Sequence, residues 1–167
     1  QGQMLGAFCL TEPQAGSDAS SLRTTARKEG DAYVLDGVKQ FITSGKNGSL
    51  AIVIAVTDKA AGKRGMSAFL VPTNTPGYVV ARLEDKAGQH SSDTAQINFE
   101  GCRIPAENLI GEEGEGYKIA LSALEGGRIG IAAQSVGMAR SALEEALRYA
   151  KERQSFGVAI INHQAVG

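Results

Sequence analysis

The hydrophobic period of the sequence changes once, near residue 110, and this change limits the possible folds more than any other feature. Before it, short apolar runs alternate with turn signals, which is typical of β-strands. After the run "IPAENLIGEEGEG", apolar residues recur at helical spacing beside charged ones. We therefore expect an α+β protein, with an antiparallel β-barrel or sandwich over residues 1–112 and long helices over 113–167. Because one helix with a broad apolar face cannot bury that face alone, it either packs on the β-domain or belongs to a C-terminal helical bundle that this chain leaves incomplete.

The first part contains five β-like runs, which predict five or more short strands. In the first run, an Asp36-Gly37 pair between two β-like segments predicts a hairpin turn, because the tight turn that joins such strands needs positive φ angles. In the last run, Ala95, Ile97 and Phe99 fall on one face. The five runs are "AYVLDGVKQFIT", "LAIVIAVT", "MSAFLVP", "GYVVARL" and "TAQINFE".

The second part predicts a helix from Tyr117 to about Arg153. Gly126-Gly127 is expected to interrupt it or to pack closely against another group, because glycine inside a helix costs about 1 kcal/mol per residue relative to alanine. Gly157 is expected to end the helix. A second helix is expected to begin near Asn162.

Composition excludes several classes of function. The chain has 167 residues, 43% of them hydrophobic, and a net charge of −1, so a core is expected and an electrostatic nucleic-acid binder is not. Two cysteines and two histidines, all far apart, predict no metal site and favour a reducing compartment. We find no signal peptide pattern, and no apolar stretch reaches the roughly 18 residues of a membrane span.

Two short motifs raise the question of a ligand site. The run Gly111–Gly116 precedes the helix, but its three glutamates would repel a phosphate, so a linker is the favoured interpretation. Gly16-Ser17-Asp18 lacks the G-x-S-x-G pattern of a serine nucleophile. Either an anchoring hydroxyl in an anion-binding turn or a plain structural turn fits it. His90 and His163 are isolated, and a surface position is favoured for both.

Taken together and in order, longer motifs resemble one family, the acyl-CoA dehydrogenases, and most closely its short- and branched-chain members. The motifs cover essentially the whole chain. They are "FCLTEPQAGSD", "FITSG", "DKAGQHSSDT", "FEGCRIPAENLIGEEGEGY", "LEGGRIGIAAQSVGMARSALEEALRYAKERQSFG" and "HQAV".

The resemblance implies FAD as cofactor and an acyl-CoA thioester as substrate. It implies α,β-dehydrogenation to a trans-2-enoyl-CoA, with electrons passed to an electron-transfer flavoprotein. A homodimer or homotetramer is implied as well, in the bacterial cytoplasm or the mitochondrial matrix. The resemblance also implies cofactor-binding roles for Phe8, Cys9, Leu10, Thr11, Gly16, Ser17, Phe41, Ile42, Thr43, Arg153, Phe156 and Gln164, and substrate-binding roles for Ser17, Glu125, Gly126, Gly127 and Arg128.

Four of these positions are given specific functions by the resemblance. Leu10 would offer its backbone and Thr11 its hydroxyl to the pyrimidine edge of the flavin, whereas the family most often has Trp where Phe41 stands. Gly126 and Gly127 would leave room for the thioester chain, which would account for two glycines inside a helix.

The resemblance provides no catalytic residue in this chain. The usual glutamate base is expected downstream of Gly167, and the helix position that holds the base in some branched-chain members is Gly127 here. Glu125 lies roughly 160–200° away around the helix and cannot simply replace it. We therefore expect a fragment without the N-terminal domain, inactive by itself and with weak or no FAD binding. The alternatives are an acyl-CoA oxidase or another flavin oxidase or monooxygenase on the same scaffold, or a non-catalytic assembly domain.

Overall fold

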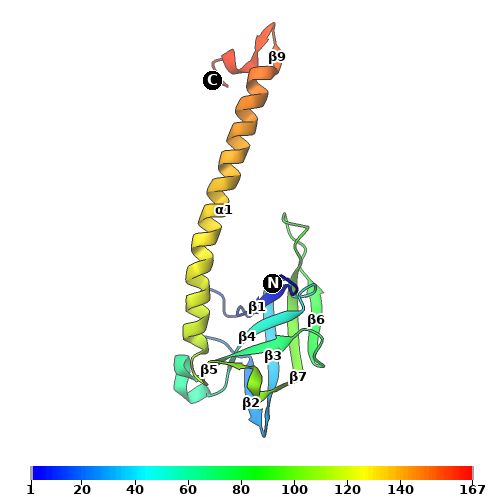
Figure 1. Cartoon of the computed structure of the whole chain (residues 1–167), viewed down its shortest axis with the longest axis vertical. Coiled ribbons are helices and arrows are strands. Elements are labelled where there is room, and N and C mark those ends of the chain that lie inside the picture. The colour runs from blue at the N-terminus through cyan, green and yellow to red at the C-terminus, as the bar shows by residue number, and fades with distance from the viewer. Residues whose placement is uncertain (1, 167) are drawn as a thin grey trace. The chain divides into compact units, whose positions relative to one another are not determined.

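The computed structural model describes residues 2–166, which form two compact units, Gln1–Ser122 and Ala123–Gly167. The first unit contains most of the strands and the second contains most of one long helix (Figure 1). This composition confirms the expected α+β class. No helix within residues 2–166 combines the length and the apolarity that crossing a membrane requires.

An eight-stranded sheet forms the first unit, and its strands follow the order β6-β7-β3-β2-β4-β5-β8, with β1 added beside β4. The sheet is sandwich-like and not a closed barrel. Its strands are β1 (Gly6–Cys9), β2 (Thr25–Glu29), β3 (Ala32–Thr43), β4 (Leu50–Val56), β5 (Met66–Pro72), β6 (Tyr78–Leu83), β7 (Thr94–Pro105) and β8 (Leu109–Ile110). Three short 3-10 helices also occur, at Lys59–Gly65, Ala106–Asn108 and Ile160–Asn162.

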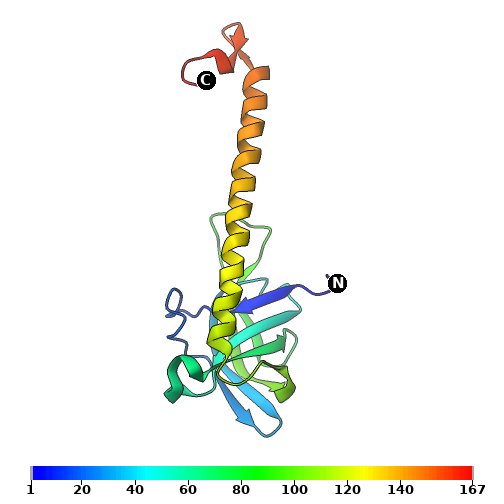
Figure 2. The same cartoon turned by 60° about the vertical axis from the view of Figure 1, so that its left-hand side comes forward.

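Most strand pairs are antiparallel, as expected, but β1 runs parallel to β4 (Figure 2). Phe8 lies opposite Ile52 in this pair. β4 and β5 match the predicted runs closely because both are almost continuously apolar and buried. Ala95, Ile97 and Phe99 of β7 are all buried, so the predicted core face of that strand is confirmed.

The predicted hairpin at Asp36-Gly37 is wrong, because β3 runs through both residues as one strand. The register with β7 shifts there, and the Asp36 carboxylate accepts a hydrogen bond from the Gly101 N–H at 2.7 Å. A Cβ on Gly37 would lie 2.6 Å from the Thr24 Cα, so glycine is needed for close packing rather than for a turn. The hairpin that does form joins β2 to β3 through Gly30, whose φ is +63°.

The helix α1 (Gly116–Glu152) is continuous, so the expected interruption at Gly126-Gly127 does not occur. Within residues 2–166, no atom other than the helix's own adjacent backbone and chain neighbours would lie within 4 Å of a Cβ added at either glycine, so close packing there is not found either. The helix ends before Gly157, which lies between the short strands β9 (Gln154–Ser155) and β10 (Val158–Ala159). The second helix expected near Asn162 is replaced by a 3-10 turn, Ile160–Asn162.

We expect Gly65→Ala to destabilise the first unit strongly. Its Cβ would lie 1.7 Å from the Asp58 carbonyl oxygen, a backbone atom that cannot move away without breaking the turn before β5. The free energy of unfolding, measured by urea denaturation, should fall by about 3 kcal/mol. Gly88→Ala is the matched control, because nothing lies within 4 Å of that position, and equal losses in both variants would contradict the prediction.

Candidate functional site

Two segments of the first unit form a surface that we call the rim, residues 8–11 and 41–43. Phe8 and Cys9 belong to β1, and Leu10 and Thr11 follow it directly. The Gln40 N–H donates to the Thr11 carbonyl oxygen at 2.8 Å. This bond joins the first segment to β3 immediately before Phe41. The sequence prediction named both segments, and the structure brings them together.

Phe41 is the most unusual residue of the rim. The register of β3 against β7 shifts between Lys39 and Ile42, so an extra residue bulges from the strand here. Phe41 takes a φ of +59° in the left-handed region and leaves 62% of its surface exposed. Ile42, the next residue, is 1% exposed. A bulky residue in this backbone region is strained, and such strain is concentrated at functional sites.

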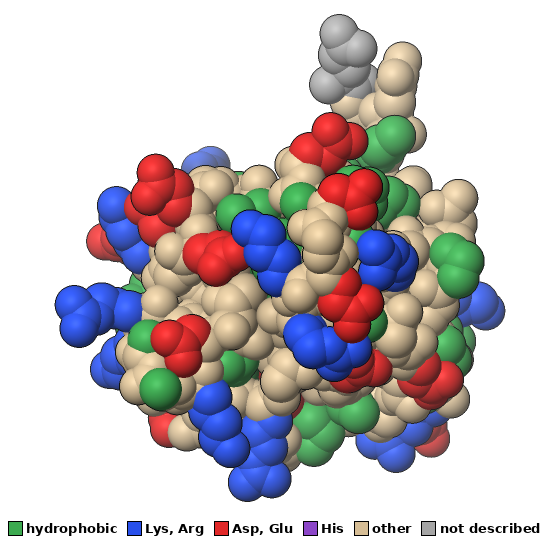
Figure 3. Space-filling view, turned by 90° about the horizontal axis from the view of Figure 1, so that it is seen from below, with side chains coloured by type: hydrophobic (Ala, Val, Ile, Leu, Met, Phe, Trp, Pro, Cys, Tyr) green, Lys and Arg blue, Asp and Glu red, His purple; other side chains and the backbone are tan. Residues whose placement is uncertain are grey.

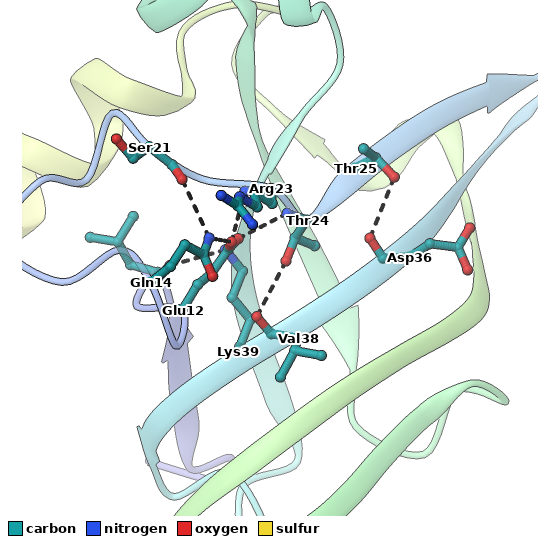
Figure 4. Close-up of polar contacts among 10 residues, drawn as sticks. Glu12, Gln14, Ser21, Arg23, Thr24, Thr25, Asp36, Val38 and Lys39 are labelled. Carbon is teal, nitrogen blue, oxygen red and sulfur yellow. Dashed lines mark hydrogen bonds and ion pairs between the residues drawn. The ribbon is translucent and has the colours of Figure 1, made fainter.

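Beneath the rim lies a buried ion pair, drawn in Figure 4. The Lys39 ammonium nitrogen lies 2.8 Å from Glu12 Oε1 and 3.0 Å from the Leu10 carbonyl oxygen. The side chains of Lys39 and Glu12 are 0% and 2% exposed. The ammonium group therefore contacts the backbone of the rim directly, from the interior of the unit.

Glu12 accepts hydrogen bonds on both carboxylate oxygens (Figure 4). Oε1 accepts from Lys39 and, at 3.0 Å, from the Thr24 N–H, and Oε2 accepts from the Arg23 N–H and the Gln14 amide, both at 2.7 Å. Burial alone would raise the pKa of Glu12, but the Lys39 ammonium and these donors hold it below its usual value. Burial lowers the pKa of Lys39, and Glu12 opposes that effect.

Cys9 belongs to the rim but offers no nucleophile. Its thiol is fully buried, and burial raises its pKa to about 12, although the nearby Lys39 charge acts in the opposite direction. A thiol with that pKa stays protonated at neutral pH. Within residues 2–166 no group of three or more His, Cys, Asp and Glu side chains could hold a metal ion. Cys9 therefore packs the inner side of the rim.

Gly16 and Ser17 lie in the exposed loop that follows the rim segment. The turn before them is closed by two backbone bonds between Glu12 and Ala15, of 2.9 and 3.0 Å. Asp18 accepts hydrogen bonds from Ser20 and Ser21, which hold the pKa of its carboxyl below the usual value. The Ser17 side chain is thereby carried at the surface beside an ordered turn.

The other predicted site residues belong to the second unit. Glu125, Gly126, Gly127 and Arg128 lie on successive positions of α1 and are all exposed. Arg153, Phe156 and Gln164 are exposed residues in and around the β9–β10 hairpin. Phe156 resembles Phe41, because it has a φ of +50° and leaves 96% of its surface exposed. The ring of Phe156 meets the His163 ring edge-on, with centroids 6.1 Å apart.

Sequence reasoning missed Lys39, Glu12 and Gln40, which connect the rim to the core. All three are buried, and the Gln40 amide donates to the Glu84 carboxylate. A lysine and a glutamine inside a strand normally predict a solvent-facing position. The available signal was that the adjacent pair Lys39-Gln40 breaks the alternation of β3, which is what a bulge does.

One face of the molecule shows basic and acidic side chains mixed without a field of a single sign (Figure 3). A protein that binds nucleic acid through its phosphates concentrates basic side chains on one surface. The mixture seen on this face is not of that kind.

Comparison with known proteins gives two family matches, which together cover most of the chain. Family models match for the acyl-CoA dehydrogenase middle domain over residues 7–102 and for the acyl-CoA dehydrogenase C-terminal domain over residues 114–167. The short-chain specific acyl-CoA dehydrogenase of Megasphaera elsdenii is 47% identical, over 99% of this chain and 44% of its own length.

Two solved structures are similar throughout the chain. One describes the electron transferring flavoprotein of Acidaminococcus fermentans, with 52% identity, a TM-score of 0.95 and coverage of 99% of this chain and 43% of the other. The second is the butyryl-CoA dehydrogenase of Megasphaera elsdenii, with 48% identity, a TM-score of 0.93 and coverage of 98% and 43%. The chain spans 44% of the length of the Megasphaera elsdenii relative and 40% of that of the mitochondrial short-chain specific acyl-CoA dehydrogenase of Rattus norvegicus.

We expect Phe41→Gly to give a more stable protein than Phe41→Ala, the reverse of the usual order in a strand. Both variants remove a largely exposed ring, but only alanine keeps a Cβ at a φ of +59°. The difference in the free energy of unfolding should be about 1 kcal/mol in favour of glycine. Urea denaturation of both variants measures it. The same pair at Thr43, also exposed but with no positive φ, is the control and should follow the usual order.

Proposed function

Because this chain belongs to the acyl-CoA dehydrogenase family, we propose that it supplies the flavin-binding rim and part of the substrate wall of an FAD-dependent acyl-CoA dehydrogenase. The reaction removes a proton from the α-carbon and a hydride from the β-carbon of a short acyl-CoA thioester, and yields a trans-2-enoyl-CoA. Bound FAD would supply the hydride acceptor. The electrons then leave to an electron-transfer flavoprotein.

The observation that carries this proposal is the junction between Thr11 and Gln40. It places an exposed aromatic residue, Phe41, near Thr11, a partly exposed residue with a hydroxyl group and with an N–H that donates to no group within residues 2–166. An apolar ring plane next to polar groups suits a planar heteroaromatic ligand, which needs stacking on its face and hydrogen bonds at its edge. The strain at Phe41 supports the same assignment, because no folding requirement explains an exposed aromatic residue there.

The chain's own residues would divide the binding work. Phe8, Phe41 and Thr43 would contact the ring system with their side chains, and Thr11 would lie at its polar edge. The buried residues Cys9, Leu10 and Ile42 would take part through the backbone that they fix. Gly16 and Ser17 would lie toward the cofactor phosphate, and Ser17 also toward the pantetheine of the substrate. Arg153, Phe156 and Gln164 would contact FAD of a neighbouring subunit, which agrees with their exposure and with the absence of an ion pair at Arg153 within residues 2–166.

The substrate wall would come from α1. Gly126 and Gly127 would allow the thioester chain to lie against the helix backbone, and nothing within residues 2–166 fills the space beside them. Glu125 and Arg128 would flank it. The proton-abstracting base is not assigned to any residue of this chain, so we propose that a complete enzyme provides it from a further segment.

The second unit supports assembly into a homodimer or homotetramer. Apolar side chains of α1 such as Ile129, Val136 and Leu143 are 72%, 70% and 60% exposed. A helix of 37 residues with such a surface needs other helices to cover it. A location in the bacterial cytoplasm or the mitochondrial matrix follows from the same proposal.

The activity test compares the full-length polypeptide with residues 1–167. The full-length protein should be yellow when purified and should reduce an artificial electron acceptor with acyl-CoAs from butyryl- to octanoyl-CoA. The isolated chain should show no turnover, because it holds no base. Oxygen consumption in place of acceptor reduction would indicate an oxidase. A colourless protein that cannot be reconstituted with FAD would overturn the proposal.

Gly126→Ala separates helix stability from substrate binding. With no atom within 4 Å of the new Cβ, the substitution should raise the free energy of unfolding of the isolated chain by up to about 1 kcal/mol. In the full-length enzyme it should raise the KM for butyryl-CoA at least about tenfold, roughly the effect of 1.4 kcal/mol, with FAD content unchanged. Gly137→Ala, equally open in the same helix, is the control. An unchanged KM in Gly126→Ala would remove Gly126 from the substrate wall.

A further inference from the structure

We propose that Lys39 is a positioning residue for the flavin, acting through the Leu10–Thr11 peptide. Its buried ammonium group holds the carbonyl end of that peptide inward, which turns the Thr11 N–H outward as a polarised donor that stabilises reduced flavin more than oxidised flavin. The inference rests on the proposed function, and it adds a role for a side chain that lies behind the rim rather than in it.

Lys39 fixes the carbonyl end of the Leu10–Thr11 peptide. Lys39 Nζ lies 3.0 Å from the Leu10 carbonyl oxygen and its side chain is 0% exposed. The neighbouring carbonyl, that of Thr11, accepts from the Gln40 N–H at 2.8 Å. Successive residues of β3 thus fix successive carbonyl groups of the rim, and the orientation of the peptide between them is determined.

Lys39 and Glu12 are both charged. Glu12 receives hydrogen bonds from four donors, Lys39, Gln14 and the N–H groups of Arg23 and Thr24. Against the effect of burial, the Lys39 ammonium group and the hydrogen bonds from the residues Arg23 and Thr24 stabilise the carboxylate and hold the pKa of Glu12 below its usual value. Glu12 is therefore ionised, and the ammonium form of Lys39 balances its charge.

The charge of Lys39 acts on the Thr11 N–H through one peptide unit. No peptide bond in the described chain is cis, so the Thr11 N–H points away from the Leu10 carbonyl and away from Lys39. A charge-assisted bond at the carbonyl end strengthens the N–H end as a donor, because hydrogen-bonded groups polarise one another where the dielectric constant is low. The Thr11 N–H donates to no other group within residues 2–166.

The flavin that this N–H would contact changes its charge on reduction. Hydride transfer brings two electrons and one proton to the flavin, so the ring system gains one negative charge, which resides mainly at its pyrimidine edge. A donor at that edge binds the reduced form more tightly than the oxidised form, and protein groups near this edge are a recognised means of tuning flavin electronics.

The test measures the midpoint potential of FAD in the full-length polypeptide with the double substitution Lys39→Met/Glu12→Gln. Removing both partners avoids an unpaired buried charge. We expect the affinity ratio of reduced to oxidised FAD to fall about tenfold, which lowers the two-electron potential by about 30 mV. Ile104→Val, a core change in the same sheet at a residue 1% exposed, should leave the potential unchanged.

A second measurement follows the Thr11 N–H itself by NMR. In the full-length polypeptide, labelling leucine carbonyls with ¹³C and threonine nitrogens with ¹⁵N restricts the NMR spectrum to Leu-Thr pairs, and residues 1–167 contain only one such pair, Leu10-Thr11. The signal that the substitution Thr11→Ser removes is that of the Thr11 amide. Its proton signal should shift when FAD binds and shift again, downfield, when the flavin is reduced.

The outcomes separate the two proposals. A full-length protein that binds no FAD would contradict the proposed function. A protein that binds FAD normally, but whose potential is the same in the double variant, or whose Thr11 signal is unmoved by reduction, would overturn the role of Lys39 alone. A potential that falls equally in Ile104→Val would assign the effect to general destabilisation and would also overturn it.

Discussion

The Lys39 ammonium group lies inside the β-rich unit with no exposed surface and two oxygen atoms within 3.0 Å, one from Glu12 and one from the Leu10 carbonyl. Removing two charges from water costs several kcal/mol for each ion, so this pair persists only because Glu12 also satisfies three other donors. Its bonds reach β3, the segment after β1 and the residues that lead into β2. The rim therefore depends on a contact that lies beneath it.

The strained backbone of Phe41 persists because the contacts around it hold the strand in place. An exposed aromatic residue with a left-handed backbone would relax if the strand around it could slip. The bond from the Gln40 N–H to Thr11 on one side and the burial of Ile42 on the other prevent that slip. The bulge thus presents a ring to solvent while the residues beside it stay in the core.

The second unit has a regular backbone, but apolar side chains on its surface are uncovered. α1 is regular over its whole length, including Gly126 and Gly127, although large apolar side chains along it are exposed. Intrinsic propensity does not explain a long helix with two adjacent glycines and an uncovered apolar surface. Both features agree with the role proposed above for the helix, as one wall of a larger assembly that binds an acyl chain.

The sequence alone determined the fold class and the near-exact bounds of β4 and β5, because apolar runs are local in the chain. Its long motifs also named the two segments that the structure brings together in the rim. It misassigned Asp36-Gly37, where the same dipeptide serves a hairpin turn or a close approach, and only the packing of Thr24 against Gly37 distinguished the two. The burial of Lys39 and the left-handed backbone of Phe41 were decided by tertiary structure. A lysine is stable in a core only where distant residues supply its counter-charge and acceptors, and no pattern within one strand records where those residues come to lie.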